Sequence, residues 1–303
     1  MRILRPAPHV WAFYDGRIEG YRFAPGANWV DDGALSLGIA SYAVVDRAEA
    51  LIYDTHCSVP HARFIRQTLE AAGVRHFTVV LSHWHLDHVA GTEVFADCPI
   101  IANSHTARHL QTHCAAIEGG TSSGAPAIAP LILPTQSFDG QAHIHIGRLH
   151  IDLIQCNIHS DDATVVWLGH DGILLAGDTV EDTVTYVSEP EHLAAHIVDL
   201  DRLTALAPRV ILPNHGAPDQ IAAGSYGPAT IKATQDYIWQ LLAARSDATL
   251  QTKPLQEWIA PALASGALTW FDPYRDIHAQ NLARTLASLA ANELCPKVGD
   301  GLK

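Results

Sequence analysis

The chain has few cysteines, and those it has are scattered. It contains five, an odd number, and no two of them form a Cys-x-x-Cys pair. Disulfide-stapled secreted domains and cysteine-based zinc modules need paired, closely spaced cysteines. The pattern therefore excludes both classes and predicts reduced thiols, as in a cytoplasmic protein. The five are Cys57, Cys98, Cys114, Cys156 and Cys295.

Basic side chains are also scarce. The sequence has 19 Lys and Arg against 32 Asp and Glu, which gives a formal net charge of -13. Binding of nucleic acid requires clustered Lys and Arg to neutralise phosphates. We therefore expect a small-molecule substrate and no nucleic-acid partner.

Long apolar runs are absent. No stretch approaches the roughly 20 apolar residues of a spanning helix, so no membrane partner is expected. The positively charged start, residues 1–8, is followed by His9, Asp15 and Arg17 rather than by an apolar segment. It is therefore not expected to be a secretory signal.

Histidine, in contrast, is abundant, with 19 residues. Its densest cluster follows the apolar run 77–81 and reads Ser82-His83-Trp84-His85-Leu86-Asp87-His88. Imidazole nitrogens and carboxylate oxygens are the ligands that zinc and similar first-row metals favour. On an extended chain alternate residues point the same way, so His83 and His85 are expected to face one metal. A turn after them would direct Asp87 and His88 to a neighbouring position.

Three more residues that can bind metal follow predicted strands. His159 comes after 153–156, Asp178 after 174–177, and His215 shortly after 210–212. Loops beyond strand ends are where layered α/β folds place their sites. These separate segments are therefore expected to meet the first motif at a shared metal centre.

With these residues the chain resembles the metallo-β-lactamase superfamily, whose members carry His-x-His-x-Asp-His, then a His, an Asp and a final His. The resemblance covers about residues 35–216. It implies an α/β fold, a four-layer αββα sandwich, here with a C-terminal helical extension. We assign residues 1–227 to the metallo-β-lactamase-like domain and 228–303 to an extension packed on it.

The resemblance also implies ligand roles. His83, His85 and His159 would bind one Zn²⁺, while Asp87, His88 and His215 would bind a second, with iron or manganese as alternative metals. Asp178 would bridge the two metals, and Asp87 would also relay a proton during catalysis. Asp54, at the end of a predicted strand, either orients a ligand imidazole or caps the chain.

The expected function is dinuclear hydrolysis of a carbonyl substrate, a β-lactam-like amide or a lactone. Ser160-Asp161-Asp162 after His159 resembles certain true β-lactamases rather than thioesterases, although those enzymes usually have Cys in place of Asp178. Two alternatives remain: a thioesterase of the hydroxyacylglutathione hydrolase type, and an iron-dependent oxidoreductase similar to sulfur dioxygenases. The tail has few basic residues, which disfavours an anionic glutathione substrate.

Several secondary predictions concern other segments. Residues 10–14 are expected to begin a hairpin at Asp15-Gly16, and 119–130 to be a mobile loop. The helical extension is expected to have helices at 228–245, 255–263 and 274–291, which pack on the sandwich or form a homodimer contact. His105, His109 and His113 on one predicted helix are predicted not to bind metal, because no carboxylate accompanies them. His192 and His196 on another helix are expected at the surface, and His143, His145 and His150 on the solvated side of a hairpin. Trp29, on a predicted loop, is expected either to face the substrate or to cap the edge of the core.

Overall fold

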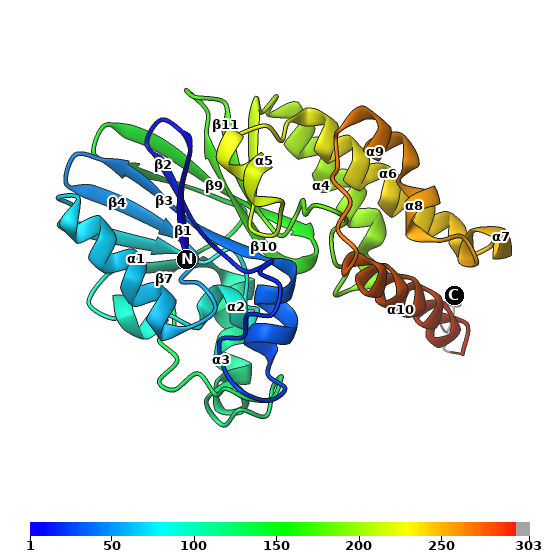
Figure 1. The fold of residues 1–303 in the computed structure, drawn as a ribbon, viewed down its shortest axis with the longest axis horizontal. Helices are drawn as coiled ribbons and strands as arrows, with labels where there is room; N and C mark the ends of the chain where they lie inside the picture. Colours follow the sequence, from blue (N-terminus) through cyan, green and yellow to red (C-terminus); the bar gives the residue numbers. More distant parts are fainter. Residues whose placement is uncertain (295–303) are drawn as a thin grey trace, which may run out of the picture.

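Two β-sheets form the centre of the molecule in the computed structural model, which describes residues 1–294 (Figure 1). Cys295 lies outside this part. The first sheet has the order β1-β2-β3-β4-β5-β6-β7 and the second the order β12-β11-β10-β9-β8. The strands of the first sheet are β1 (Arg2–Ala7), β2 (Val10–Asp15), β3 (Ile39–Asp46), β4 (Glu49–Tyr53), β5 (His76–Val80), β6 (Ile100–Asn103) and β7 (Gln136–Phe138). Those of the second are β8 (Gln141–Ile146), β9 (Leu149–Ile158), β10 (Ser160–Leu168), β11 (Ile173–Gly177) and β12 (Val210–Pro213).

Helices connect and cover these sheets. Those of the first half are η1 (Val30–Leu35), α1 (Val59–Ala71), α2 (Leu86–Val89), η2 (Thr92–Phe95) and α3 (Ser104–Glu118). Those of the second half are η3 (Pro190–His192), α4 (Leu193–Ala205), α5 (Pro218–Ala223), α6 (Pro228–Ala244), α7 (Ala248–Gln251), α8 (Leu255–Trp258), α9 (Ala260–Ser265) and α10 (Tyr274–Leu294). No described helix is long and apolar enough to cross a membrane.

The first sheet changes from antiparallel to parallel pairing at β4. Strands β1 to β4 pair antiparallel, whereas β5, β6 and β7 each pair parallel with the strand before. Helix α1 makes the crossover from β4 to β5. It begins where the hydroxyl of Ser58 accepts a hydrogen bond from the backbone N–H of His61, and Gly73, with a φ of 101°, follows its end. This is the strand–helix–strand unit expected from the sequence.

Two apolar layers hold the sandwich together. Tyr42 and Leu51 from the first sheet meet Leu153 and Val165 from the second in one buried cluster. On its other face, the first sheet packs on α1 and α3 in a second cluster, while α4 packs on β9 outside the second sheet. The architecture is therefore the predicted αββα sandwich, with helices outside both sheets (Figure 1).

The C-terminal helices extend the layer outside the second sheet. Helix α6 packs on α4, and α10 packs on α6 and η3. Leu241 of α6 and Trp258 of α8 belong to the same apolar cluster as Leu174 of β11. The helical extension is thus present, whereas its assignment as a separate unit starting at residue 228 stays a prediction.

Two local expectations were wrong. The first hairpin joins β1 to β2 and turns at Pro8 and His9, where His9 has a φ of 64°. Asp15-Gly16 ends β2 instead of forming the turn. The expected helix 255–263 is interrupted at Ile259, because Pro261 cannot supply a backbone N–H to a continuous helix.

Candidate metal centre

The opening motif lies where β5 ends and α2 begins. His83 and His85 occupy the connection after β5, and Asp87 and His88 fall in the single turn of α2. His85 has an extended backbone, with φ -64° and ψ 150°, and precedes the helix directly. The backbone thus changes from extended to helical between the two pairs of residues, and the ring of His88 still lies 4.2 Å from that of His83 between centroids.

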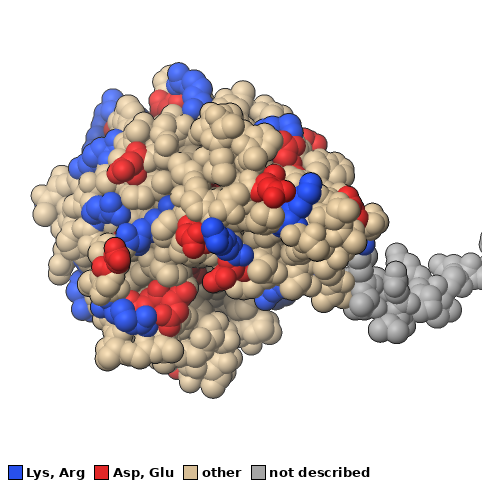
Figure 2. Space-filling model, turned by 45° about the vertical axis from the view of Figure 1, so that its right-hand side comes forward, with Lys and Arg blue, Asp and Glu red and all other residues tan. Residues whose placement is uncertain are grey.

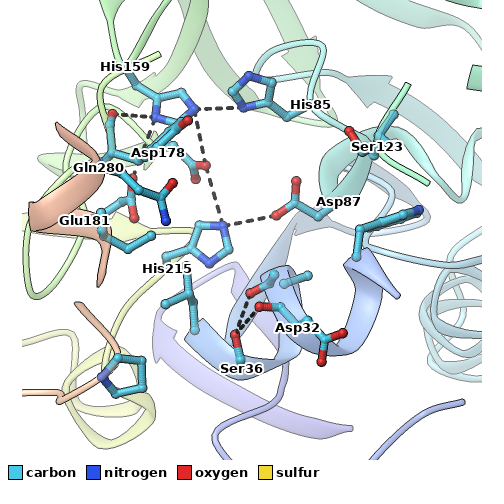
Figure 3. A pocket seen from close by; sticks show the side chains of 18 of the residues that line it. Asp32, Ser36, His85, Asp87, Ser123, His159, Asp178, Glu181, His215 and Gln280 are labelled. Carbon is cyan, nitrogen blue, oxygen red and sulfur yellow. Dashed lines mark hydrogen bonds and ion pairs between the residues drawn. The ribbon is translucent and has the colours of Figure 1, made fainter. Parts of the chain in front are cut away.

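The structure brings together all seven residues singled out in the sequence. Figure 3 shows five of them: His85, Asp87, His159, Asp178 and His215. Four imidazoles surround Oδ2 of Asp178, which lies 3.2 Å from Nε2 of His88 and 3.5 Å from Nε2 of His215. The same oxygen lies 3.6 Å from Nε2 of His83 and 3.7 Å from Nε2 of His159. Asp178 therefore stands among four histidines that come from the β5–α2 segment, the β9–β10 connection and the end of β12.

Around Asp178 the other six residues form two groups of three. Nδ1 of His85 lies 2.9 Å from Nε2 of both His83 and His159, so these three nitrogens converge. In the other group, Oδ2 of Asp87 lies 3.2 Å from Nε2 of His215 and 3.6 Å from Nε2 of His88. Side chains from β5–α2, β9–β10, β11 and β12 thus meet at one end of the sandwich.

The donor atoms suit bound cations. Oδ1 of Asp178 is buried and finds no hydrogen-bond partner within residues 1–294. Leaving such a group unpaired costs about 1–3 kcal/mol, more for a charged group. Imidazoles and carboxylates converging on a shared centre are ligands for zinc, iron or manganese. The residues therefore fit the metals that the sequence implied.

The protonation states of the first group support this fit. Burial, followed by the charges of nearby imidazoles, lowers the pKa of His83 and brings that of His85 to about 3. Burial also lowers the pKa of His159. Neutral imidazole is the form that binds metals.

The second group carries the negative charge. Burial opposes ionisation of Asp87 and Asp178, yet His88 and His215 outweigh it and hold the pKa of both carboxyls below the ordinary range. Conversely, burial lowers the pKa of His215, but Asp178 and Asp87 raise it to about 9. In the metal-free chain protons on these imidazoles balance the carboxylates, and a bound cation would replace them.

Hydrogen bonds to the other ring nitrogens orient several of these histidines. Nδ1 of His88 lies 2.9 Å from Oδ2 of Asp54, whose Oδ1 accepts from the backbone N–H of Ser82 at 2.7 Å. Nδ1 of His215 lies 2.7 Å from the carbonyl oxygen of Gly38. Of the two roles considered for Asp54, the structure supports orientation of an imidazole.

One glycine is required by close packing at the site. Gly177, which ends β11 just before Asp178, has a φ of 58°. A Cβ at this position would lie 2.7 Å from the hydroxyl of Tyr53 and 3.2 Å from Cβ of Ser82. Any larger residue would push the strand end carrying Asp178 away from β5.

A cavity of about 490 Å³ opens onto the two groups (Figure 3). Trp29, Leu37 and Trp84 supply apolar surface, and Trp29 Nε1 donates to the carbonyl oxygen of Pro126 at 2.9 Å. That bond ties the segment before η1 to the loop 119–130. Trp29, whose role the sequence left open, is therefore a wall of the cavity.

Helix α10 also reaches this cavity through Asp276, Ile277 and Gln280. The sequence did not identify these residues, since nothing in the helical pattern of 274–291 marks the turn that faces the site. Glu181 was missed as well. It is 1% exposed, and burial together with the charge of Asp178 raises its pKa to about 8.

The histidines on α3 differ from expectation in one respect. Asp161 does accompany them, with its two oxygens 3.2 Å from Nδ1 of His105 and 2.7 Å from Nε2 of His109. The rings of His109 and His113 stack on Trp84, with centroids 5.5 and 4.7 Å away. The group therefore supports a cavity wall.

Of two other groups of histidines, one lies where the sequence predicted and the other does not. His196 was expected at the surface but is fully buried on α4, where the helix packs on β9. His143 and His150 lie exposed on the hairpin β8–β9, as expected, and share Asp152 at 2.5 and 3.1 Å. The error at His196 arose because spacing alone does not reveal which helical face is covered.

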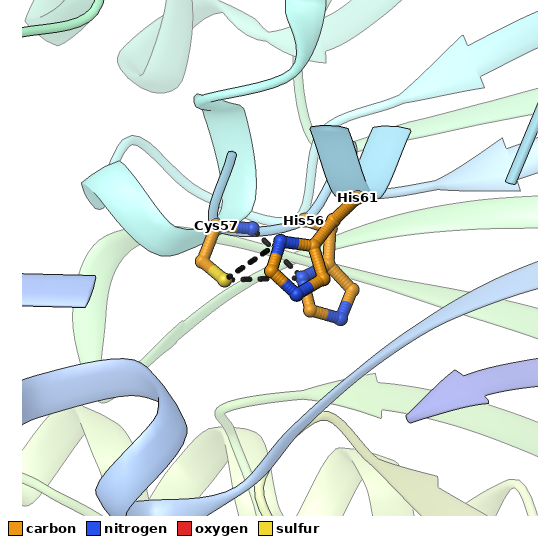
Figure 4. A group of neighbouring side chains, drawn as sticks. All are labelled: His56, Cys57 and His61. Carbon is orange, nitrogen blue, oxygen red and sulfur yellow. Dashed lines mark hydrogen bonds between the residues drawn. The ribbon is translucent and has the colours of Figure 1, made fainter. Parts of the chain in front are cut away.

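A further cluster, His56, Cys57 and His61, is buried near the start of α1 (Figure 4). The backbone N–H of Cys57 donates to Nδ1 of His56 at 2.9 Å. Nδ1 of His61 lies 2.6 Å from the hydroxyl of Ser58, and its Nε2 lies 3.0 Å from Oδ2 of Asp15. Since three of the four ring nitrogens have protein partners, the cluster acts as a junction between β2 and α1.

Comparison with known proteins gives a consistent result. The family model described as the metallo-β-lactamase superfamily matches residues 36–215. A search of curated proteins found no match. Several solved structures share the fold at low sequence identity.

A metallo-β-lactamase family protein from Thermus thermophilus is 18% identical, with a TM-score of 0.61 and 94% of each chain covered. A metallo-β-lactamase from Pontibacter korlensis is 17% identical, with a TM-score of 0.58, covering 78% of this chain and 98% of its own. The DIM-1 metallo-β-lactamase is 17% identical, with a TM-score of 0.58 and coverages of 77% and 94%. The family match spans more than half of the sequence and includes all seven clustered residues, so this chain belongs to the metallo-β-lactamase superfamily.

Proposed function

We propose that this protein is a dinuclear metal-dependent hydrolase that cleaves an uncharged carbonyl substrate, with a lactone as the first candidate. The observation that carries the proposal is the convergence of four imidazole nitrogens within 3.2–3.7 Å of one oxygen of Asp178. A ligand set for two cations would account for these buried basic and acidic groups around a single atom.

In this proposal His83, His85 and His159 hold one metal, Asp87, His88 and His215 hold the other, and Asp178 is shared. Zinc is the first candidate metal, with iron or manganese as alternatives. Two bound dications supply Lewis acidity and generate hydroxide from water at neutral pH.

Asp87 is the proposed catalytic residue of the chain. Its side chain is 20% exposed, whereas that of Asp178 is 4% exposed. It also lines the cavity. Oδ2 lies 3.2 Å from Nε2 of His215. At the cavity this carboxylate would accept a hydrogen bond from an entering water, orient it and relay its proton to the leaving group.

The cavity lining favours a substrate without negative charge. Among the described residues that line it, none is Lys or Arg, whereas Asp32 and Asp276 contribute acidic groups at the rim. The carboxylate of a β-lactam or of glutathione would gain no cationic partner from these side chains. The indoles of Trp29 and Trp84 fit an apolar acyl chain instead.

Surface charge agrees with this preference. The face in Figure 2 carries acidic and basic side chains mixed together, and most of its area is neither. Such a surface does not concentrate anionic substrates by long-range attraction.

The test is a hydrolysis panel with zinc-loaded protein that compares an acyl lactone, an uncharged thioester and a β-lactam. We expect turnover of the lactone to exceed that of the β-lactam. His83→Ala and Asp178→Ala should each abolish turnover and reduce bound metal per chain. Full metal content and activity in either variant would refute the ligand assignment, and protein purified with iron and little zinc would count against hydrolysis.

A further inference from the structure

Glu181 is a buried carboxyl group of the cavity that the proposed chemistry does not use. It lies three residues after Asp178, in the loop that follows β11, and lines the cavity (Figure 3). Its two oxygens bond to different parts of the chain. These contacts connect the C-terminal helices with the metal centre.

The first contact comes from the helical extension. The hydroxyl of Tyr274, the first residue of α10, donates to Oε2 of Glu181 at 3.1 Å. Tyr274 is fully buried, so water does not substitute for this bond. A buried carboxyl oxygen that lost this donor would have an unmet hydrogen-bonding need.

The second contact closes the loop around Glu181. The backbone N–H of Tyr186 donates to Oε1 at 2.9 Å. The backbone N–H of Glu181 donates to the hydroxyl of Thr185 at 3.0 Å. Together these bonds fix residues 181–186 as a compact turn with the Glu181 side chain at its centre.

The same turn orients a histidine of the metal centre. The carbonyl oxygen of Tyr186 lies 2.9 Å from Nδ1 of His159, which directs the opposite nitrogen, Nε2, toward His85 and Asp178. Oε1 of Glu181 itself lies 3.7 Å from Nδ1, too far for a direct hydrogen bond. Glu181 therefore acts on His159 through the backbone of Tyr186.

We propose that Glu181 is a positioning residue through which the C-terminal extension holds His159 in place for metal binding. The path runs from Tyr274 through Glu181 and Tyr186 to His159. The proposal rests on the proposed function, since it takes His159 to be a metal ligand. It makes the extension a component of the metal centre as well as a covering for the sandwich.

Tyr274→Phe is the main test, because it removes only the hydroxyl. Thr230→Val is the matched control. The hydroxyl of Thr230 in α6 is also buried in the extension and donates to the carbonyl oxygen of Ala267 at 3.1 Å. Both residues lie outside the turn 181–186.

The test has two readouts. Competition with a chelator gives the zinc affinity of each variant, and visible absorption reports the ligand geometry of the Co²⁺-substituted protein. Tyr274→Phe should weaken binding of one metal about tenfold and alter the Co²⁺ spectrum, as expected when a contact that orients a ligand is lost. Thr230→Val should match the unmodified protein in both measurements. Equal affinities and spectra in all three proteins, or equal losses in both variants, would overturn the proposal.

A second test compares the zinc affinities of Glu181→Gln, which keeps a hydrogen-bonding side chain, and Glu181→Ala, which removes it. The glutamine carbonyl can still accept from the N–H of Tyr186, so Glu181→Gln should keep affinity within about threefold, whereas Glu181→Ala should lose about tenfold or more. An equal loss in both variants would contradict positioning by hydrogen bonds. If the unmodified protein bound no metal, the proposed function would fail, a result distinct from unequal behaviour of these variants.

Discussion

Asp54 shows how a single buried carboxylate can serve two strand ends. It accepts from the N–H of Ser82 after β5 and from Nδ1 of His88 in α2, and the side-chain amide of Asn214 after β12 donates to it. It is fully buried. Its charge therefore fixes the tautomer of His88 in which Nε2 is free to bind a metal.

We predict that Asp54→Asn weakens binding of the second metal by about 10- to 100-fold, an order of magnitude typical of carboxylates behind a ligand histidine. The amide keeps the shape and one acceptor oxygen but removes the charge that polarises His88. Calorimetric titration of metal-free protein with Zn²⁺ measures the change. Two binding steps with unchanged affinities would show that Asp54 has no such role.

At the scale of secondary-structure elements, a hydrogen bond between the Asp15 carboxylate and His61 joins β2 to α1. Asp15 at the end of β2 is 6% exposed and bonds to His61 in the first turn of α1 and to the N–H of Gly16. Burial alone would raise the pKa of Asp15, but these bonds hold it well below the ordinary range. The ionised form is therefore the one that stabilises the fold.

A pH-dependent contribution to stability follows from this depressed pKa. Because the folded-state pKa lies below the unfolded value of about 3.9, the contribution is complete above that value and is lost as the pH falls through the folded-state pKa. Asp15→Asn should lower the free energy of unfolding by about 1 kcal/mol or more at about pH 5–7. The difference from the unmodified protein should shrink below about pH 4.

Urea unfolding at several pH values checks this prediction. Titration of the metal-centre residues is common to both proteins, so it cancels in the difference. Asp272→Asn is a suitable control, since Asp272 is 69% exposed and pairs with Arg275 on the surface. A difference for Asp15→Asn that stayed constant down to about pH 3 would show that its ionisation is not linked to folding.

At the scale of the whole molecule, the proposed ligand assignment predicts that metal binding and folding are coupled. Each group of the centre draws residues from separate segments of the chain, so the seven side chains come together only in the folded chain. A ligand that binds only the folded state stabilises it by mass action, by about 2.7 kcal/mol at a concentration about 100 times its Kd.

Removal of metal with a chelator should therefore lower the melting temperature by about 5 °C or more. Zn²⁺ added in excess should restore it. Differential scanning calorimetry gives both values, and His83→Ala in parallel should show a smaller response. A melting temperature that did not change with chelator would contradict a stabilising metal centre.

The clustering of the seven residues was predictable because metal-binding chemistry restricts residue type and because strand ends can be recognised locally. His159, Asp178 and His215 each follow a short apolar run. Glu181 and Tyr274 were not predictable, since the bond between them joins residues 93 positions apart and depends on how α10 packs. The prediction that His196 is exposed was wrong for the same reason. Its burial is decided by tertiary packing, which helical spacing does not encode.

The layout of the cavity has a consequence for how this protein can change over evolutionary time. The clustered histidines and aspartates are anchored to strand ends within the rigid sandwich, whereas Trp29, Ser122 and Gln280 reach the cavity from three surface segments. Mutations in those segments can reshape the cavity without moving a metal-binding atom. Selection for a new substrate should therefore accumulate changes near Trp29, in 119–130 and at the start of α10, leaving the strand ends intact.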